Sequence, residues 1–277
     1  MKLSTGNFYI EKYGTEAGAE RMAELGFTYL DLDLSDVKNE YYAARDEEFI
    51  VKLLSVKKSL EKFGVKTLLA RGPLPEKTNS DEERALAFEK IVKAMVAVRH
   101  LGGSHLTVSP IYFSEISDSE SALSSAREYY AALSEVARGL GVTLCLENAA
   151  NENPLSGFAV THSLVEKISS PNLRLSLSVA AANAVGDNPS ELITEAGKLL
   201  SVVRAEDSTP DNATPLPLFD GTVDWAALAE ALFNEGFNGI LSATAPAYLQ
   251  NGASPLSDEE ACALENQSAS YARLIAS

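Results

Sequence analysis

The chain has 277 residues, a formal net charge of −16 and 45% hydrophobic residues. These values fit one large α/β domain with a full core, and the acidic balance disfavours nucleic-acid binding, which needs clustered Lys and Arg. No apolar run approaches the about 20 residues that span a bilayer. The N-terminus shows no signal peptide, so we expect a cytoplasmic protein. Cys145 and Cys262 lie far apart in the sequence and are expected to be free thiols.

A short junction recurs along the chain, in which a helical segment ends at a glycine and an apolar run follows at once. It occurs at Gly26, Gly64, Gly102, Gly141 and Gly236. Glycine just past a helix favours the left-handed backbone of a C-terminal cap, where a Cβ would clash. The first four junctions repeat roughly every 40 residues, which indicates one helix and one strand per repeat. Repeated βα units of this kind form a parallel sheet.

The first half of the chain predicts five strands with helices between them. The expected strands are 2–4, 28–34, 66–71, 105–109 and 143–147. The expected helices are 15–25, 46–63, 80–101 and 119–140. Ser80 and Glu83 have the spacing of a capping box at a helix start. The aromatic residues Phe8, Tyr9 and Tyr13 are expected in the loop after the first strand.

The second half continues the same alternation. Its expected strands are 173–178, 201–207 and 238–244, and its expected helices are 163–168, 189–200, 224–235 and 258–275. Eight strands and eight helices without a linker predict an α/β protein, a single (β/α)8 TIM barrel domain over residues 1–277. Long polar loops follow three strands, at 149–161, 208–222 and 245–256. In a barrel such loops lie at the C-terminal face, where active sites are built.

Several strand ends carry distinctive short sequences. They are LARGPL at 69–74, LCLEN at 144–148, LSVAAAN at 177–183, GDNP at 186–189 and GTVDW at 221–225. In this order they resemble the xylose-isomerase-like barrel superfamily, specifically its sugar-phosphate isomerase/epimerase branch, over nearly the whole chain. The resemblance implies a divalent metal, often manganese, zinc or magnesium. It also implies two glutamates that move a proton next to a sugar carbonyl.

Carried over residue by residue, most metal ligands of that family are replaced in this chain. The glutamate that ends the fifth strand falls on Glu147 and is present. The aspartate of the sixth strand falls on Ser178, and the His-x-His of the seventh falls on Arg204 and Glu206. The glutamate of the eighth strand falls on Thr244. We therefore expect a degenerate metal site and no metal cofactor.

The histidines support the same expectation. The family histidines at the ends of the third and fourth strands fall on Arg71 and Ser109. The chain has three histidines, and His100, His105 and His162 are all predicted away from the C-terminal strand ends. Metal sites of this kind combine carboxylates with imidazoles, so these positions do not provide the expected ligands.

Polar residues at the strand ends nevertheless predict a binding site. Side chains two residues apart on a strand share a face, so several of them are expected to converge at the barrel mouth. The candidate catalytic residues are Glu147 and Glu206. The candidate substrate-binding residues are Asp33, Arg71, Ser109, Asn148, Ser178, Arg204 and Thr244.

Three functions fit this set of residues. In the first, Arg71 or Arg204 supplies positive charge beside Glu147, and the site binds a small sugar-like or anionic ligand. In the second, Glu147 and Glu206 act as acid and base in a metal-independent sugar isomerase or epimerase, with Arg71 polarising the substrate oxygen. In the third, the chain is a non-catalytic paralogue that binds a partner protein. The substrate, the oligomeric state and the presence of activity stay open.

Overall fold

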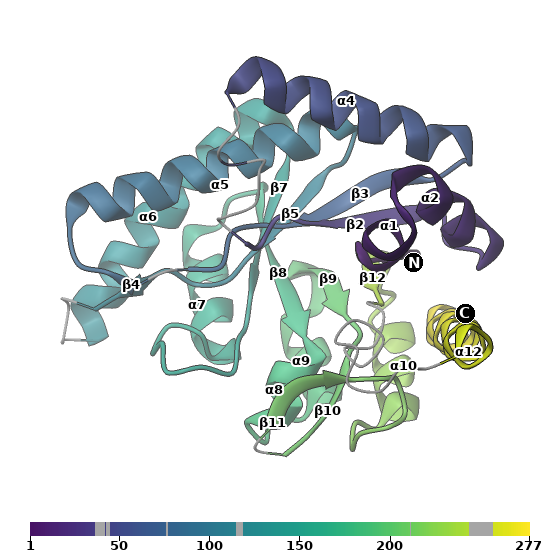
Figure 1. The fold of residues 1–277 in the computed structure, drawn as a ribbon. Helices are drawn as coiled ribbons and strands as arrows, with labels where there is room; N and C mark the ends of the chain where they lie inside the picture. The colour runs from purple at the N-terminus through teal and green to yellow at the C-terminus, as the bar shows by residue number, and fades with distance from the viewer. Residues whose placement is uncertain (37–41, 43–44, 76, 115–118, 211, 244–256) are drawn as a thin grey trace. The chain divides into compact units, whose positions relative to one another are not determined.

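A computed structural model describes residues 1–36, 42, 45–75, 77–114, 119–210, 212–243 and 257–277. The barrel strands are β1 (Lys2–Thr5), β2 (Tyr29–Asp33), β3 (Lys66–Arg71), β5 (His105–Val108), β7 (Thr143–Glu147), β8 (Leu173–Ser178), β9 (Leu200–Arg204) and β12 (Ile240–Ser242). They form a closed barrel in the order β1-β12-β9-β8-β7-β5-β3-β2 (Figure 1). The predicted (β/α)8 fold class is therefore confirmed.

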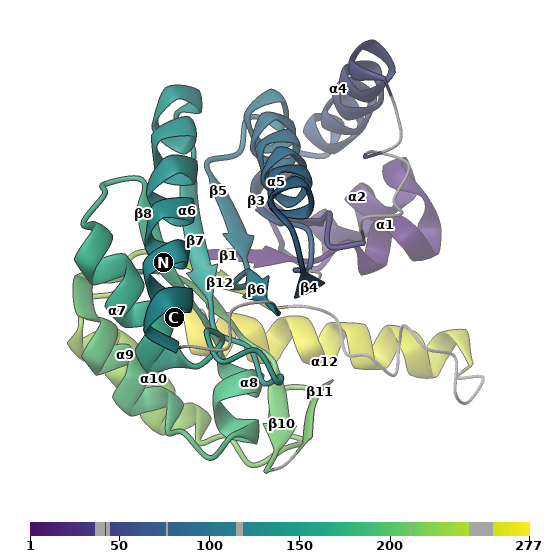
Figure 2. The same cartoon turned by 90° about the vertical axis from the view of Figure 1, so that its left-hand side faces the viewer.

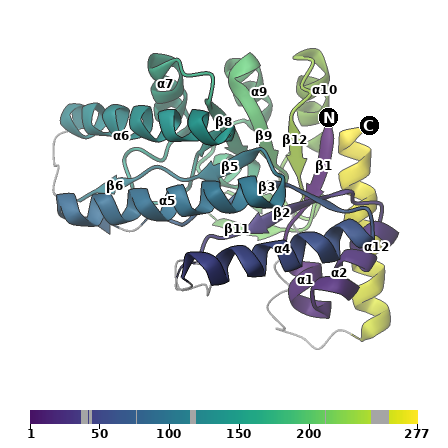
Figure 3. The same ribbon diagram turned by 90° about the horizontal axis from the view of Figure 1, so that it is seen from above.

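Helices flank the strands. They are α1 (Phe8–Tyr13), α2 (Thr15–Glu24), α4 (Asp46–Lys62), α5 (Asp81–Leu101), α6 (Ser119–Leu140), α7 (Phe158–Ile168), α8 (Val179–Ala184), α9 (Pro189–Ala196), α10 (Trp225–Asn234) and α12 (Asp258–Ala276), with a short 3-10 turn at Gly197–Leu199. Helices α5 and α6 lie side by side (Figure 2), as do α9 and α10 (Figure 3). Among the described residues, no helix has the length and apolar character that crossing a membrane requires.

The chain divides into two compact units. Unit 1 comprises Met1–Asp31, Ser59–Val65 and Leu177–Ser277, and unit 2 comprises Leu32–Lys58 and Lys66–Ser176. Each unit has its own pattern of strand pairing. In unit 1, β1 pairs in parallel with β12, and β12 pairs with β9. In unit 2, β3 pairs in parallel with β5, and β5 pairs with β7.

The glycine junctions adopt the backbone that the sequence predicts. The φ angles of Gly26, Gly64, Gly102, Gly141 and Gly236 lie between 61° and 84°. At the end of α5, for example, the N–H of Gly102 bonds to the carbonyl of Arg99 at 3.1 Å. A Cβ is disfavoured in this conformation, so glycine both ends the helix and turns the chain into the next strand.

At the start of α5, one of the two hydrogen bonds of the predicted capping box is present. The Ser80 hydroxyl accepts a hydrogen bond from the Glu83 N–H at 3.2 Å. The Glu83 carboxylate, however, accepts from the N–H of Asn79 rather than from that of Ser80. The helix start is therefore capped from both sides, with the second bond displaced by one residue.

Two local predictions are wrong. Phe8, Tyr9 and Tyr13 lie in helix α1 rather than in a loop, because Phe8 and Tyr9 are buried and Gly14, with φ of 82°, separates α1 from α2. The strand predicted at 201–207 ends at Arg204. A new strand, β10 (Asp207–Thr209), then pairs antiparallel with β11 (Asn212–Leu216) inside the segment expected to be a plain loop.

Two further differences concern unit 2. The loops after β3 and β5 each contain a short strand, β4 (Lys77–Thr78) and β6 (Tyr112–Phe113), and these pair in parallel. Helix α7 begins at Phe158, earlier than the expected residue 163, because Phe158 and Leu164 are both buried on its inner side. Runs of two residues are too short to give a periodic signal, which explains why the sequence did not predict β4 and β6.

Alternation along the unit 2 strands separates an apolar row from a polar row. Ala70, Leu106 and Leu144 are register neighbours and are fully buried. The next row is formed by Arg71, Thr107 and Cys145. Because side chains two apart share a face, this second row continues to Glu147. The register thus brings polar groups from several strands to one face of the sheet.

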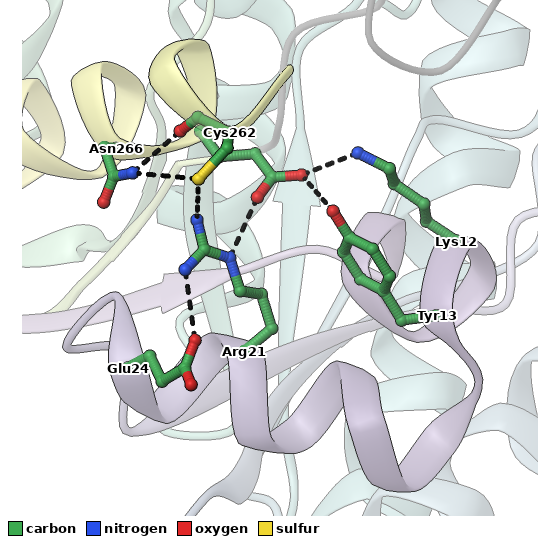
Figure 4. Close-up of polar contacts among 7 residues, drawn as sticks. Lys12, Tyr13, Arg21, Glu24, Cys262 and Asn266 are labelled. Carbon is green, nitrogen blue, oxygen red and sulfur yellow. Dashed lines mark hydrogen bonds and ion pairs between the residues drawn. The ribbon is translucent and has the colours of Figure 1, made fainter. Parts of the chain in front are cut away.

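In unit 1, a buried carboxylate on α12 connects the two ends of the chain. Glu265 is 0% exposed. Its Oε1 accepts hydrogen bonds from Lys12 Nζ and Tyr13 Oη, both at 2.8 Å, and its Oε2 accepts from Arg21 Nε at 3.0 Å (Figure 4). Burial alone would raise the pKa of Glu265, but these three donors outweigh it, and the pKa lies below the ordinary value.

Arg21 extends this cluster to a cysteine. Its Nη1 donates to Glu24 at 3.1 Å, and its Nη2 donates to the Cys262 sulfur at 3.3 Å (Figure 4). Both Cys262, which is exposed, and Cys145, which is buried, are free, as predicted. The sequence analysis did not find this cluster, because its members are separated by more than 200 positions in the chain.

We expect Glu265→Gln to lower the free energy of unfolding by about 2 kcal/mol at pH 7, because an amide cannot satisfy three donors as a carboxylate does. Since the folded-state pKa is lowered, this stabilisation is present above the ordinary glutamate pKa of about 4.3 and is lost as pH falls through the folded-state value. Urea titrations at pH 7 and near pH 3 measure the free energy of unfolding of Glu265→Gln and of the unaltered protein. The difference between these two free energies should be smaller near pH 3 than at pH 7.

The matched control is Glu24→Gln, which removes an exposed partner of the same arginine. It should change the free energy of unfolding by less than about 0.5 kcal/mol. Equal stability of Glu265→Gln and the unaltered protein at pH 7 would contradict the role given to the Glu265 carboxylate.

Candidate functional site

Three residues of barrel strands in unit 2 form a polar cluster, here called the Glu147 group: Arg71, Glu147 and Ser176. Glu147 ends β7 and is 2% exposed, and its Oε2 accepts a hydrogen bond from Ser176 Oγ at 2.7 Å. Arg71 ends β3, and its Nη2 lies 3.9 Å from Glu147 Oε1. This is an ion pair longer than a hydrogen bond. The Arg71 side chain is 35% exposed, so its guanidinium remains accessible to a ligand.

The strand register explains why these three residues meet. Glu147 and Ser176 are direct register partners on β7 and β8. Arg71 lies in the same polar row as Cys145. Cys145 precedes Glu147 by two residues on β7, so their side chains share a face of the strand. Burial, together with the nearby Glu147 carboxylate, raises the pKa of the Cys145 thiol. Cys145 therefore stays protonated and acts as a packing residue beneath the group.

A second buried ion pair lies in unit 1. Arg204 Nη1 contacts Asp31 Oδ2 at 2.7 Å, and each side chain is 2% exposed. Ser242, the register partner of Arg204, donates from its Oγ to the same Asp31 oxygen at 2.7 Å. Among the described residues, neither Asp31 Oδ1 nor Ser4 Oγ has a hydrogen-bond partner. Arg204 thus neutralises a buried aspartate that the sequence analysis did not include among the site residues.

Asp207 organises the hairpin that follows β9. Its Oδ1 accepts from the N–H groups of Ser208 at 2.8 Å and Val223 at 3.2 Å. Its Oδ2 accepts from the Phe219 N–H at 3.0 Å and from Trp225 Nε1 at 2.8 Å. These four hydrogen bonds connect Asp207 to both ends of the 207–225 segment, so the carboxylate fixes the position of that segment.

The remaining candidates of unit 1 are placed as follows. Ser178 ends β8, and its Oγ accepts from the Ala181 N–H at 3.3 Å, which caps helix α8. Glu206 follows Ala205 between β9 and β10 and is buried. Thr244 lies outside the described residues.

The other candidates of unit 2 lie at the end of a barrel strand or directly after it. The Asp33 carboxylate accepts from the Ser35 N–H at 2.8 Å at the end of β2. Asn148 directly follows Glu147 and is buried. The Ser109 carbonyl accepts from the Tyr130 hydroxyl at 3.3 Å.

All three histidines lie away from the C-terminal ends of the barrel strands, as predicted, although His162 lies inside α7 rather than before the expected helix 163–168. His105 begins β5, and its Nδ1 is 2.8 Å from the Ser104 hydroxyl. His100 is in the last turn of α5, and His162 stacks on Phe158 within α7. Within the described part of the chain, no three His, Cys, Asp or Glu side chains are grouped so that they could hold a metal ion.

Sequence reasoning missed Asp31, Ser176 and Asp207. Asp31 has a weak signal, because it precedes the candidate Asp33 by two residues and shares its strand face. Ser176 becomes recognisable only through its register with Glu147, which the sequence does not reveal. Asp207 was assigned to the end of a strand that stops at Arg204.

Comparison with known proteins supports one fold family. The family profile described as Xylose isomerase-like TIM barrel matches residues 19–266. No sequence among curated proteins matches the chain. Similar solved structures include D-psicose 3-epimerase with D-tagatose from Clostridium cellulolyticum H10, with a TM-score of 0.79 and 16% identity over 99% of each chain.

Two further structures are similar over almost their whole length. 3-Keto-D-glucoside 4-epimerase from E. coli has a TM-score of 0.76 and 16% identity over 99% of each chain. L-ribulose 3-epimerase has a TM-score of 0.74 and 19% identity, covering 100% of this chain and 97% of that chain. At these identities the likeness establishes the fold.

Removing the buried guanidinium of Arg204 should destabilise the folded protein. We expect Arg204→Met to lower the free energy of unfolding by about 3–5 kcal/mol, because it leaves the Asp31 carboxylate buried without its cation. The double variant Asp31→Asn, Arg204→Met should recover part of that loss, since it removes both charges. Urea denaturation of the two single variants, the double variant and the unaltered protein measures the coupling. Additive losses would contradict the pairing.

Asp207→Ala should loosen the hairpin around the chain's one tryptophan. We expect the fluorescence emission of Trp225 to shift to longer wavelength, because its indole N–H loses the Asp207 carboxylate and the 207–225 segment loses three further bonds. Asp220→Asn, at an exposed position of the same segment, is the matched control and should leave the emission unchanged. Identical spectra for all three proteins would show that Asp207 does not hold the segment.

Proposed function

The chain belongs to the xylose isomerase-like TIM barrel family, and we propose that it binds a small sugar-like or anionic ligand at the C-terminal ends of the barrel strands. The observation that carries this proposal is the Glu147 group. A buried carboxylate and a neighbouring hydroxyl offer hydrogen bonds to sugar hydroxyls. The accessible Arg71 guanidinium offers a planar pair of donors to a phosphate or carboxylate.

The sugar class is supported by the names of the similar structures, which include several sugar epimerases. The same fold serves many chemistries, so the ligand class depends on the site itself. In unit 2 the site combines one negative and one positive group at strand ends, which suits a ligand that carries hydroxyls and one anionic group.

The donor chemistry supports binding without the divalent metal of the family. Metal sites of this kind need at least three carboxylate or imidazole ligands. Of the positions that the resemblance assigns to them, Glu147 keeps a carboxylate, and Glu206 provides a second one where the family has a histidine. Ser178 has a hydroxyl that caps α8, and Arg204 has a cationic group that binds Asp31. We therefore propose that the metal site is degenerate, and we assign no reaction step to a metal.

A second candidate function is favoured by the contact between Glu147 and Arg71. Glu147 is a carboxylate that can accept a proton from the carbon next to a carbonyl, while Arg71 stabilises the developing oxygen charge. In this metal-independent isomerase or epimerase, Glu206 is the proposed partner acid. It is buried in unit 1. The non-catalytic paralogue remains the third candidate, and the experiment below distinguishes the three.

The test begins with metal-free protein. After chelation, the protein is titrated calorimetrically with D-fructose, D-tagatose and their phosphates, and each mixture is then analysed chromatographically for conversion. We expect at least one sugar or sugar phosphate to bind. Arg71→Gln should weaken a phosphorylated ligand about tenfold and a neutral sugar less, because the guanidinium is accessible to the anion. Arg138→Gln, an exposed arginine on α6, is the matched control.

Each outcome identifies one candidate. Binding without conversion supports a ligand-binding protein, and conversion that disappears in Glu147→Gln supports the metal-independent enzyme. Binding of none of these compounds contradicts the proposed ligand class and favours the protein-binding paralogue. A stoichiometric metal, retained after incubation with manganese and removal of the excess, would contradict the degenerate metal site.

A further inference from the structure

A groove lies between helices α5 and α6 of unit 2, which are side by side (Figure 2). Its volume is about 470 Å³, within the roughly 300–1,000 Å³ that small-molecule sites occupy. It is lined by one side of each helix and by Phe113 of β6. None of its lining residues belongs to the Glu147 group or to the other candidate residues. We propose that this groove binds a small organic diammonium ion.

Aromatic rings form part of the groove. Phe88 of α5 and Tyr129 of α6 meet edge to face, with their ring centroids 5.7 Å apart. The third ring, that of Phe113, already has a cation over it, because the guanidinium carbon of Arg84 lies 5.8 Å from its centroid. Aromatic faces attract cations within about 6 Å, and they recognise organic ammonium ions in this way. Phe88 and Tyr129 therefore provide the same kind of surface for the cationic groups of a ligand.

Two carboxylates determine the charge of the ligand. Glu89 on α5 and Glu128 on α6 line the groove and are exposed, and neither has a hydrogen-bond or ion-pair partner among the described residues. The basic residue of the lining, Arg84, forms an ion pair with Asp81, so it does not compensate them. One uncompensated carboxylate thus remains on each helix. A ligand with two ammonium groups balances both charges.

The hydroxyl of Tyr129 is a further acceptor in the lining. Its oxygen is buried, and it has no hydrogen-bond partner within the described part of the chain. A buried hydroxyl without a partner is costly, because it has lost its hydrogen bonds to water. An ammonium group seated against Tyr129 donates the hydrogen bond that this oxygen lacks, and the methylene chain of the ligand covers the aromatic rings.

The test uses three probes of nearly equal size that differ in charge: 1,4-diaminobutane, 4-amino-1-butanol and 1,4-butanediol. The protein is titrated with each probe at pH 7 and low ionic strength, where exposed charges are least screened. The ring signals of Phe88 and Tyr129 are followed by NMR. We expect saturable shifts of both rings. The diamine should bind about threefold more tightly than the amino alcohol, and the diol should bind most weakly.

Matched variants separate this site from attraction by the acidic protein as a whole. Glu89→Gln and Glu128→Gln should each remove the advantage of the diamine over the amino alcohol, because one of the two ammonium contacts is lost. Glu82→Gln changes the net charge by the same amount at an exposed position of α5 outside the lining, and it should preserve that advantage.

Ala85→Phe fills the groove from α5 and should weaken the binding of all three probes. Absence of saturable shifts at the two rings, or unchanged diamine binding in Ala85→Phe, would overturn the site. Equal affinity for the diamine and the diol would overturn its cationic class. An equal loss in Glu82→Gln and in the two groove variants would show a response to net charge alone, which also overturns the site. The groove shares no residue with the Glu147 group, so this result is independent of the proposed sugar site.

Discussion

Burying a carboxylate away from water is costly unless other groups compensate its charge, and this constraint determines much of the polar interior of the protein. Asp31 has an arginine and a serine hydroxyl. Asp207 has four N–H donors, and Glu265 has three side-chain donors from two helices. Glu147 differs in its position, because Glu147 and Arg71, whose atoms Oε1 and Nη2 lie 3.9 Å apart, both end barrel strands.

This difference has a consequence for chemistry on the family's fold. A barrel of this kind places its site where strands end, and the residue types at those ends determine the reaction. Among the candidate residues, Ser178 and Arg204 have structural roles, since the Ser178 hydroxyl caps a helix and Arg204 neutralises Asp31. The Glu147 group in unit 2 brings a carboxylate, a hydroxyl and a guanidinium together at these strands.

The sequence predicted what depends on neighbouring residues and missed what depends on distant ones. The glycine junctions, the eight barrel strands and the position of Glu147 follow from local patterns, and the structure confirms the strands and the glycine backbone. The partners of the buried charges cannot be predicted from local patterns. Arg204 and Asp31 are 173 positions apart, and no periodicity indicates such a contact. Short strands such as β4 and β10 were also missed, because two or three residues carry too little pattern to recognise.

The connection through Glu265 also bears on the order in which the chain folds during synthesis. Unit 1 needs both the first 31 residues and everything from Leu177 onwards, and Glu265 meets Lys12 across 253 positions. Unit 2 lies between these parts and uses a nearly continuous stretch of chain. The central unit has all of its residues before the last hundred have been made. Lys12, Tyr13 and Arg21 can bind Glu265 only after the last helix has been synthesised, so this connection between distant parts of the chain forms late.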